Sequence, residues 1–229
     1  NRVQPVGKQS THYSSYGCNY TRTTGIWQTV WMEAVHPKAL KSVQVITDVD
    51  NAQVIVNPMF YSLGGTRLRA ILRDGEKVVV QKTIMASEST PLILPVKKAK
   101  LWSPESPFLY DLDYEVLDEQ GNVVDQVHSY VGMRKIHAEG NRLYLNNEPY
   151  YLRMVLDQGY YPESQWTAPS DSALKNDILL SKAIGFNGAR LHQKVFEERF
   201  HYWADKLGYL TCGEMNSWGL DYNLPIAGA

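Results

Sequence analysis

Apolar and polar side chains alternate with a period of two over several short runs between residues 38 and 136. Such alternation is typical of β-strands that bury one face. The alternating positions are Val43, Val45, Thr47 and Val49; Leu68, Ala70 and Leu72; Val78 and Val80; Tyr110, Leu112, Tyr114 and Val116; and Val123, Val127 and Val131. Asp74-Gly75 and Gln120-Gly121-Asn122 are turn signals between runs. We therefore predict a two-sheet β-sandwich without a helix over residues 38–136.

From about residue 137 the pattern changes to alternating strands and helices. Two strands are predicted at 143–145 and 150–155, around a turn at 146–149. A helix from Ser170 or Ser172 to about 184 and a strand at 186–192 follow. A second helix, with apolar positions Phe200, Trp203, Ala204 and Leu207, then leads to a strand at 209–214. Gly185 and Gly208 end the helices. This alternation implies parallel strands with right-handed crossovers. It opens either a (β/α)₈ barrel or a doubly wound sheet, although no glycine-rich phosphate loop follows the first strand.

Residues 1–37 contain one clear pattern. After Gly25, apolar groups occupy both faces of a predicted strand at residues 26–33, as in a strand buried on both sides. Because one strand cannot fold alone, we interpret residues 1–37 as the end of a β-domain. The sequence thus predicts three parts, at residues 1–37, 38–136 and 137–229.

Composition narrows the classes of partner. Hydrophobic residues make up 44% and charged residues 21% of the 229 residues, which favours a packed core over disorder. The net charge of -1 gives no support to a nucleic-acid or anionic-membrane partner, and no apolar run reaches membrane-spanning length. The two cysteines, Cys18 and Cys212, have no metal-ligand spacing and predict free thiols. None of these features indicates a cellular compartment.

Several motifs together resemble one known family. In chain order they are Thr24-Gly25-Ile26-Trp27-Gln28-Thr29-Val30-Trp31, Leu101-Trp102-Ser103-Pro104-Glu105-Ser106-Pro107-Phe108-Leu109-Tyr110, Val131-Gly132-Met133-Arg134-Lys135-Ile136, Leu143-Tyr144-Leu145-Asn146-Asn147-Glu148-Pro149, Gly185-Phe186-Asn187-Gly188-Ala189-Arg190, and Trp203-Ala204-Asp205-Lys206-Leu207-Gly208. Their order and spacing resemble family 2 glycoside hydrolases, which include β-galactosidases, β-glucuronidases and β-mannosidases. The resemblance covers nearly the whole chain.

The resemblance implies a fold and an activity. The fold would be multidomain, β plus α/β: the end of a jelly-roll sugar-binding domain, an immunoglobulin-like β-sandwich, and the first three or so βα units of a TIM barrel. The activity would be hydrolysis of O-glycosidic bonds by a retaining mechanism, which uses two carboxyl groups about 5–5.5 Å apart. In the family both groups are glutamates at barrel strands four and seven. We therefore expect no catalytic residue within residues 1–229, and no activity of this segment alone.

The same resemblance assigns pocket roles to residues near the predicted strand ends. An arginine at the place of Arg190 holds the nucleophile ionised in the family. A glutamate at the place of Glu214 lines the pocket and in some members helps to hold a metal, so Glu214 is also a candidate metal ligand. The alternative is a structural carboxylate paired with Arg190. No cofactor is required by the resemblance, although a divalent cation is compatible with the complete enzyme.

Three further polar residues are candidates for binding sugar hydroxyls. Asp157 and Gln158 follow the first parallel strand, where they would either bind substrate or cap the loop. His192 lies two residues after Arg190, whereas the family has a histidine three residues after it, where Gln193 stands here. The rings that would either stack on sugars or pack the loop are Tyr160, Tyr161, Trp166 and Trp218.

The expected partner is a β-linked oligosaccharide or glycoside, with no nucleic acid and no membrane. Three βα units leave a parallel edge strand uncovered, which favours a further partner: a second copy in a homo-oligomer, or the remainder of the chain. Another class of function stays open, a non-catalytic β-sandwich that binds carbohydrate or spaces domains.

Overall fold

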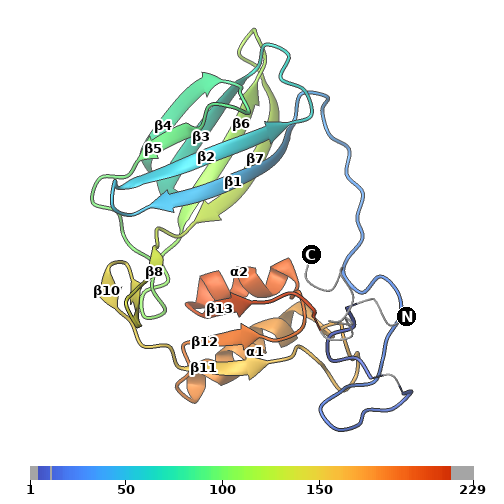
Figure 1. The fold of residues 1–229 in the computed structure, drawn as a ribbon. Coiled ribbons are helices and arrows are strands. Elements are labelled where there is room, and N and C mark those ends of the chain that lie inside the picture. Colours follow the sequence, from blue (N-terminus) through green and yellow to red (C-terminus); the bar gives the residue numbers. More distant parts are fainter. Residues whose placement is uncertain (1–4, 11, 218–229) are drawn as a thin grey trace. The chain divides into compact units, whose positions relative to one another are not determined.

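The computed structural model describes residues 5–10 and 12–217 and has two compact units (Figure 1). We call Met32–Tyr151 the sandwich unit, and Asn1–Trp31 together with Leu152–Ala229 the parallel unit. The boundaries at residues 37 and 136 inferred from the sequence stay a prediction.

The sandwich unit contains two antiparallel sheets. The strands are β1 (Leu40–Asp48), β2 (Gln53–Phe60), β3 (Arg67–Asp74), β4 (Lys77–Met85), β5 (Leu92–Pro95), β6 (Tyr110–Leu117) and β7 (Val123–Val131). One sheet has the order β1-β2-β5 and the other β4-β3-β6-β7. Leu68, Ala70 and Leu72 of β3 are fully buried in the core, as their period of two predicts. The sandwich is confirmed, and none of the unit's residues is helical.

Strands β2 and β5 were not predicted from the sequence. Pro58 lies inside β2, and a proline normally argues against a strand because it cannot donate a backbone hydrogen bond. It is tolerated because β5 pairs only with residues 53–56 of β2, so Pro58 has no β5 partner on that side. The predicted turns are confirmed: Gly75 and Gly121 adopt positive φ between β3 and β4 and between β6 and β7.

A small three-stranded sheet completes the sandwich unit. Its strands are β8 (Ile136–Glu139), β9 (Arg142–Leu145) and β10 (Glu148–Pro149). Asn146 and Asn147 both have positive φ in the tight turn that the sequence predicts there. The side chain of Asn146 donates to Trp102 O at 2.9 Å and accepts from Lys135 N at 3.0 Å. These bonds fasten the turn to the fully buried Trp102.

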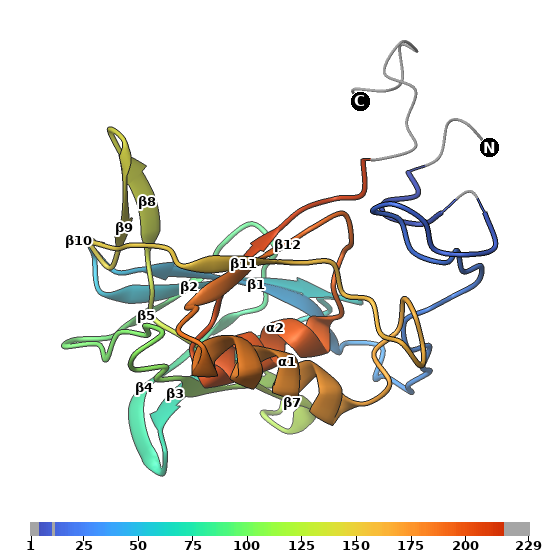
Figure 2. The ribbon, with the colours of Figure 1, turned by 90° about the horizontal axis from the view of Figure 1, so that it is seen from below.

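The parallel unit contains β11 (Met154–Asp157), α1 (Asp171–Ala183), β12 (Gly188–Leu191), α2 (Glu198–Leu207) and β13 (Leu210–Gly213). Its strands are parallel and in sequential order. Both helices cover the same face of the sheet (Figure 2). Their side chains pack on Ala189 and Leu191 of β12, and this shared core is Leu174, Ile178, Ala189, Leu191, Phe196, Phe200, Ala204 and Tyr209.

The helix ends agree with the sequence signals. Ser170 caps α1, where its Oγ accepts a hydrogen bond from Ala173 N at 3.1 Å. Gly208 ends α2 in the left-handed conformation, with φ 73°. The strand predicted at 150–155 begins too early, because β11 begins at Met154 and residues 150–153 belong to no strand.

The strand predicted at residues 26–33 is wrong for this structure. Residues 5–10 and 12–37 form isolated bridges but no strand. The exposed fraction is 83% at Ile26, 74% at Val30 and 97% at Met32. A strand needs a neighbour to satisfy its backbone groups, and no described strand pairs with this segment. Residues 26–33 therefore have the apolar pattern of a strand but are not part of a sheet among the described residues.

No helix among the described residues combines the length and apolar character needed to cross a membrane.

Gly188 generates a testable prediction about packing in the parallel sheet. A Cβ at Gly188 would lie 2.5 Å from the backbone oxygen of Leu210 and 2.9 Å from Met154 Cε. We expect Gly188→Ala to lower the free energy of unfolding of the parallel unit by about 1–3 kcal/mol, because backbone cannot easily move aside. Urea denaturation followed by circular dichroism measures the change. Gly213→Ala is the matched control, since a Cβ at Gly213 meets no atom within 4 Å; equal losses in both variants would contradict the prediction.

Candidate functional site

The candidate site lies at the carboxyl edge of the parallel sheet. Asp157, Leu191 and Gly213 are the last residues of their strands, and they stand in one row across the ladder. The residues that follow them in sequence therefore meet at one edge. In barrels and open α/β sheets, this is the edge where polar side chains form binding and active sites.

Glu214 is the centre of a polar cluster at this edge. Its Oε2 accepts from Arg190 Nε at 2.9 Å and lies 2.8 Å from Arg190 Nη2. Its Oε1 accepts from Gln193 N at 2.8 Å and from Gln193 Nε2 at 3.2 Å. His192 Nδ1 lies 2.6 Å from the same Oε1. The structure thus brings together three of the predicted site residues, Arg190, His192 and Glu214.

The cluster favours the ionised form of Glu214. Partial burial raises its pKa, but the hydrogen bond from Arg190, the backbone N–H of Gln193 and the charges of His192 and Arg190 lower it by more. The net pKa of Glu214 therefore lies below the usual value for a glutamate. A carboxylate held in this way accepts hydrogen bonds and does not serve as a proton donor near neutral pH.

Gln193 contributes more than sequence reasoning anticipated. It was noted only because it replaces a family histidine, yet it bonds Glu214 through both its backbone and its side chain. Its amide also donates to Ser217 Oγ and accepts from Ser217 N, both at 2.9 Å. Its φ of 58° is uncommon for a residue other than glycine. Sequence alone does not signal Ser217 as a partner.

Asp157 and Gln158 belong to a separate cavity of about 490 Å³. Its other lining residues include Tyr160, Tyr161 and Asp177. Asp157 Oδ1 accepts a hydrogen bond from Gly159 N at 2.9 Å. This bond agrees with the alternative in which Asp157 caps the loop instead of binding substrate. Burial raises the pKa of Asp157, and the nearby charge of Asp177 adds to the effect although the Gly159 bond opposes it. Gln158 Oε1 is buried and has no hydrogen-bond partner among the described residues.

Asp177 was missed because it lies on α1 rather than after a strand. Tyr161 donates from its hydroxyl to Asp177 Oδ2 at 2.7 Å. Burial raises the pKa of Asp177, against the opposing effects of that hydrogen bond and of the charge of Lys194. One sequence signal could have found it: the carboxylate stands one residue before Ile178, on the turn of α1 that is buried against the sheet.

The aromatic residues around this cavity pack against one another. Trp166 is 4% exposed and meets Trp27 and Tyr160 edge-on, with ring centroids 5.6 and 5.1 Å apart. Tyr160 stacks on Tyr20 at 4.0 Å. For Trp166 these contacts favour loop packing over sugar stacking, because a buried ring has no face to offer a ligand. Trp218 lies outside the described residues.

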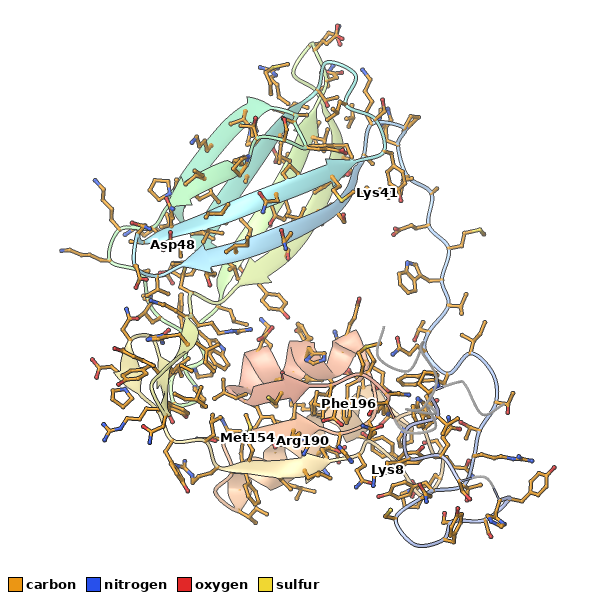
Figure 3. The ribbon with its side chains drawn as sticks, in the orientation of Figure 1. Lys8, Lys41, Asp48, Met154, Arg190 and Phe196 are labelled. Atoms are coloured by element: carbon orange, nitrogen blue, oxygen red, sulfur yellow. The ribbon has the colours of Figure 1, made fainter. Side chains whose placement is uncertain are left out.

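Figure 3 labels Arg190 and Met154 on neighbouring strands of the parallel unit. Leu156, Arg190 and Cys212 stand in one row across the sheet, and all three are exposed. This is the face opposite the helices. Arg190 therefore projects from the face of the sheet that the two helices do not cover.

The described residues contain no group of three or more His, Cys, Asp or Glu side chains that could hold a metal ion. Near Glu214, His192 is the side chain able to act as a second ligand. The metal role of Glu214 stays a prediction.

A polar cluster at the carboxyl edge of parallel, sequentially ordered strands defines a βα-type site, and the same chain also contains a β-sandwich. Comparison with known proteins shows which family this chain resembles. Residues 38–134 match the model of the glycosyl hydrolases family 2. A β-glucuronidase of Paenibacillus borealis is 26% identical over 226 residues, which is 95% of this chain and 35% of that protein. A β-galactosidase of Lactococcus lactis is 26% identical over 85% of this chain and 19% of its own length.

Solved structures agree on the fold. The β-glucuronidase of Ruminococcus gnavus in complex with D-glucuronic acid superposes with a TM-score of 0.70 at 23% identity, over 80% of this chain and 31% of that one. The β-D-glucuronidase of Dictyoglomus thermophilum gives a TM-score of 0.69 at 25% identity, over 82% and 31%. The chain thus spans about a third of these proteins. The matches confirm the resemblance to family 2 glycoside hydrolases, whose members compared here are glycosidases.

The lowered pKa of Glu214 generates a testable prediction. A carboxyl group whose pKa is lower in the folded state stabilises the fold above the unfolded value, roughly 4.3, and this stabilisation is lost as pH falls through the folded value. We expect Glu214→Gln to cost on the order of 1 kcal/mol at pH 7 and much less at pH 3. Urea denaturation at the two pH values checks this. Glu163→Gln, at an exposed position, is the control; a cost for Glu214→Gln that stays constant with pH would refute the expectation.

Proposed function

We propose that residues 1–229 form the substrate-binding part of a retaining glycoside hydrolase that cleaves the O-glycosidic bond of a β-galactoside or β-glucuronide. The observation that carries this proposal is the Arg190–Glu214 pair, with bonds of 2.8–2.9 Å, at the carboxyl edge of three parallel strands. The relatives with these names, a β-glucuronidase and a β-galactosidase, support the substrate class.

The proposed domains are those implied by the motifs. The two sheets of residues 38–136 correspond to an immunoglobulin-like sandwich, and residues 1–37 to the end of a jelly roll. Strands β11, β12 and β13 correspond to the first three strands of a TIM barrel. Their sequential order supports a barrel over a doubly wound sheet, whose strand order reverses at a switch point. Both helices lie on one face, as the outer ring of a barrel requires (Figure 2).

The proposed chemistry divides between this segment and groups outside it. A retaining mechanism needs an acid/base and a nucleophile, and the two family glutamates have no counterpart in residues 1–229. Arg190 supplies a fixed positive charge that would hold the nucleophile ionised, because a guanidinium donates several hydrogen bonds from a rigid plane. Glu214 orients Arg190 and His192 and forms part of the pocket wall.

Sugar hydroxyls are the proposed partners of the remaining polar groups. The carboxylate of Asp157 can accept hydrogen bonds from hydroxyls in the adjoining cavity, and the amide of Gln158 can accept or donate them. His192, which is 9% exposed beside Glu214, is the third candidate. No cofactor takes part in this proposal, and a divalent cation would depend on Glu214 and His192 together with groups outside this segment.

Turnover of nitrophenyl glycosides tests the proposal. We expect the natural full-length protein that carries residues 1–229 to hydrolyse 4-nitrophenyl β-D-galactoside or β-D-glucuronide, and the segment alone to hydrolyse neither. In the full-length protein, Arg190→Ala should lower kcat/KM on the order of a hundredfold, because the nucleophile loses its electrostatic partner. Arg199→Ala is the matched control, since Arg199 forms a surface ion pair with Asp171 on the helix side.

Two outcomes would contradict this assignment. Turnover by the segment alone that disappears in Glu214→Gln would make Glu214 a catalytic residue. A full-length protein that binds glycosides without hydrolysing them would favour the alternative, a non-catalytic carbohydrate-binding or spacer module.

A further inference from the structure

Lys194 is a lysine with almost no contact with solvent. Its exposed fraction is 1%, although lysine is among the residues least often fully buried. Removing an ammonium group from water is costly unless hydrogen bonds and opposite charges replace the water. The surroundings of Lys194 supply both, so the residue holds a defined place in the fold.

Two backbone carbonyls accept hydrogen bonds from the ammonium group. Lys194 Nζ donates to Gly159 O at 2.7 Å and to Trp166 O at 2.6 Å. These carbonyls stand at the two ends of residues 159–166, which we call the rim loop. The loop follows β11 directly after Asp157 and Gln158. A single side chain from the segment after β12 therefore ties down both ends of the loop after β11.

Aromatic rings surround the same ammonium group. Nζ lies 4.8 Å from the ring centroid of Trp27, 5.0 Å from Phe196 and 5.7 Å from Trp166, within the range of cation–π attraction. Thr167 Oγ1 also donates to Trp27 O at 3.0 Å. Residues far apart in sequence, from the segment before the sandwich and from the rim loop, thus converge on one positive charge.

Nearby carboxylates offset the positive charge of Lys194, while the two backbone carbonyls keep its hydrogen bonds. Glu197 Oε1 lies 3.8 Å from Nζ, which is longer than a hydrogen bond. Burial lowers the pKa of Lys194, and the charges of Glu197, Asp157 and Asp177 offset only part of this effect. The charge of Lys194 is therefore coupled to Asp157, the carboxylate that stands at the end of β11.

The close contact with Lys194 also explains why residue 159 is a glycine. A Cβ there would lie 2.8 Å from Phe196 Cζ and 2.9 Å from Lys194 Nζ, and its φ of 61° disfavours other residues. The backbone after Gln158 is consequently in direct contact with the lysine. Any shift of Lys194 is transmitted to the residue next to Gln158.

We propose that Lys194 is a positioning residue for sugar binding: it fixes the rim loop and, through Gly159, sets where Gln158 and Asp157 meet the substrate. This inference rests on the function proposed above. It differs from a purely structural role, because it requires that loss of the charge weaken substrate binding rather than stability alone.

Lys194→Met tests the inference in the natural full-length protein, because methionine keeps a similar stem without the charge. We expect KM for the hydrolysed nitrophenyl glycoside to rise about tenfold, with kcat changed less than about twofold. This combination indicates that binding of the substrate and binding of the transition state are weakened equally. Lys182→Met is the matched control. Lys182 Nζ also donates to two carbonyls, Leu207 O and Gly208 O at 2.5 and 2.7 Å, but it does so at the opposite edge of the sheet. It should leave KM unchanged.

A double-mutant cycle identifies the route of the effect. If Lys194 acts through Gln158, then Gln158→Ala and Lys194→Met should together raise KM by much less than the product of their separate effects. Independent, multiplicative effects would overturn the claim that Gln158 is the residue positioned. An unchanged KM in Lys194→Met, with a loss of stability like that of Lys182→Met, would overturn the positioning role altogether.

Hydrogen exchange provides a readout that does not need activity. Amides of residues 158–166 should exchange faster in Lys194→Met and not in Lys182→Met. If the full-length protein hydrolyses no glycoside, the proposed function fails, and this exchange result alone decides whether Lys194 fixes the loop. Should Lys194→Met not fold, Lys194→Gln, which keeps a neutral donor, replaces it with the same expectations; unchanged exchange in the variant that folds refutes the inference.

Discussion

The parallel register of β11, β12 and β13 is the constraint on which the site depends. Pairing Asp157 with Leu191 and Leu191 with Gly213 ends the three strands in one row, so each following residue leaves the sheet at the same edge. Glu214 comes one residue after β13 and Arg190 is the penultimate residue of β12, so their side chains meet at 2.8–2.9 Å. A slip of one residue between β11 and β12 would turn Arg190 to the helix face, and a slip between β12 and β13 would displace Glu214, so either would break the cluster.

Two charges of opposite sign organise this edge in different ways. Glu214 is partly accessible and collects donors from Arg190, Gln193 and His192, which stabilise its ionised form. Lys194 is buried and collects acceptors, the carbonyls of Gly159 and Trp166. The first arrangement presents polar groups to the open face of the sheet. The second holds the loop that borders the neighbouring cavity. Lys194 and two of the donors to Glu214, His192 and Gln193, come from the short segment after β12, which makes residues 192–194 the structural centre of the proposed pocket.

Much of the fold was predictable because it depends on local patterns. Alternation at Leu68, Ala70 and Leu72, the glycine turns and the helix signals at Ser170 and Gly208 each act within a few residues. The sequence-based predictions failed where the pairing of a segment with a distant strand decides its structure. Strand β2 tolerates Pro58 because β5 is short, and residues 26–33 form no strand because no described strand pairs with them. For the candidate site, the sequence predicts that Arg190, His192 and Glu214 belong to one pocket, and the structure brings these three side chains together.

The sequence by itself determined the two-sheet sandwich, the parallel strand–helix alternation and the resemblance to family 2 glycoside hydrolases, because these follow from periodicity and from ordered motifs. Only the tertiary structure decided that Asp157 and Gln158 face a different cavity from Glu214, that Asp177 joins that cavity from α1, and that Lys194 is buried. The physical reason is that burial and ion pairing depend on which distant segments meet. A lysine in sequence carries the same charge whether it lies in water or between two carbonyls.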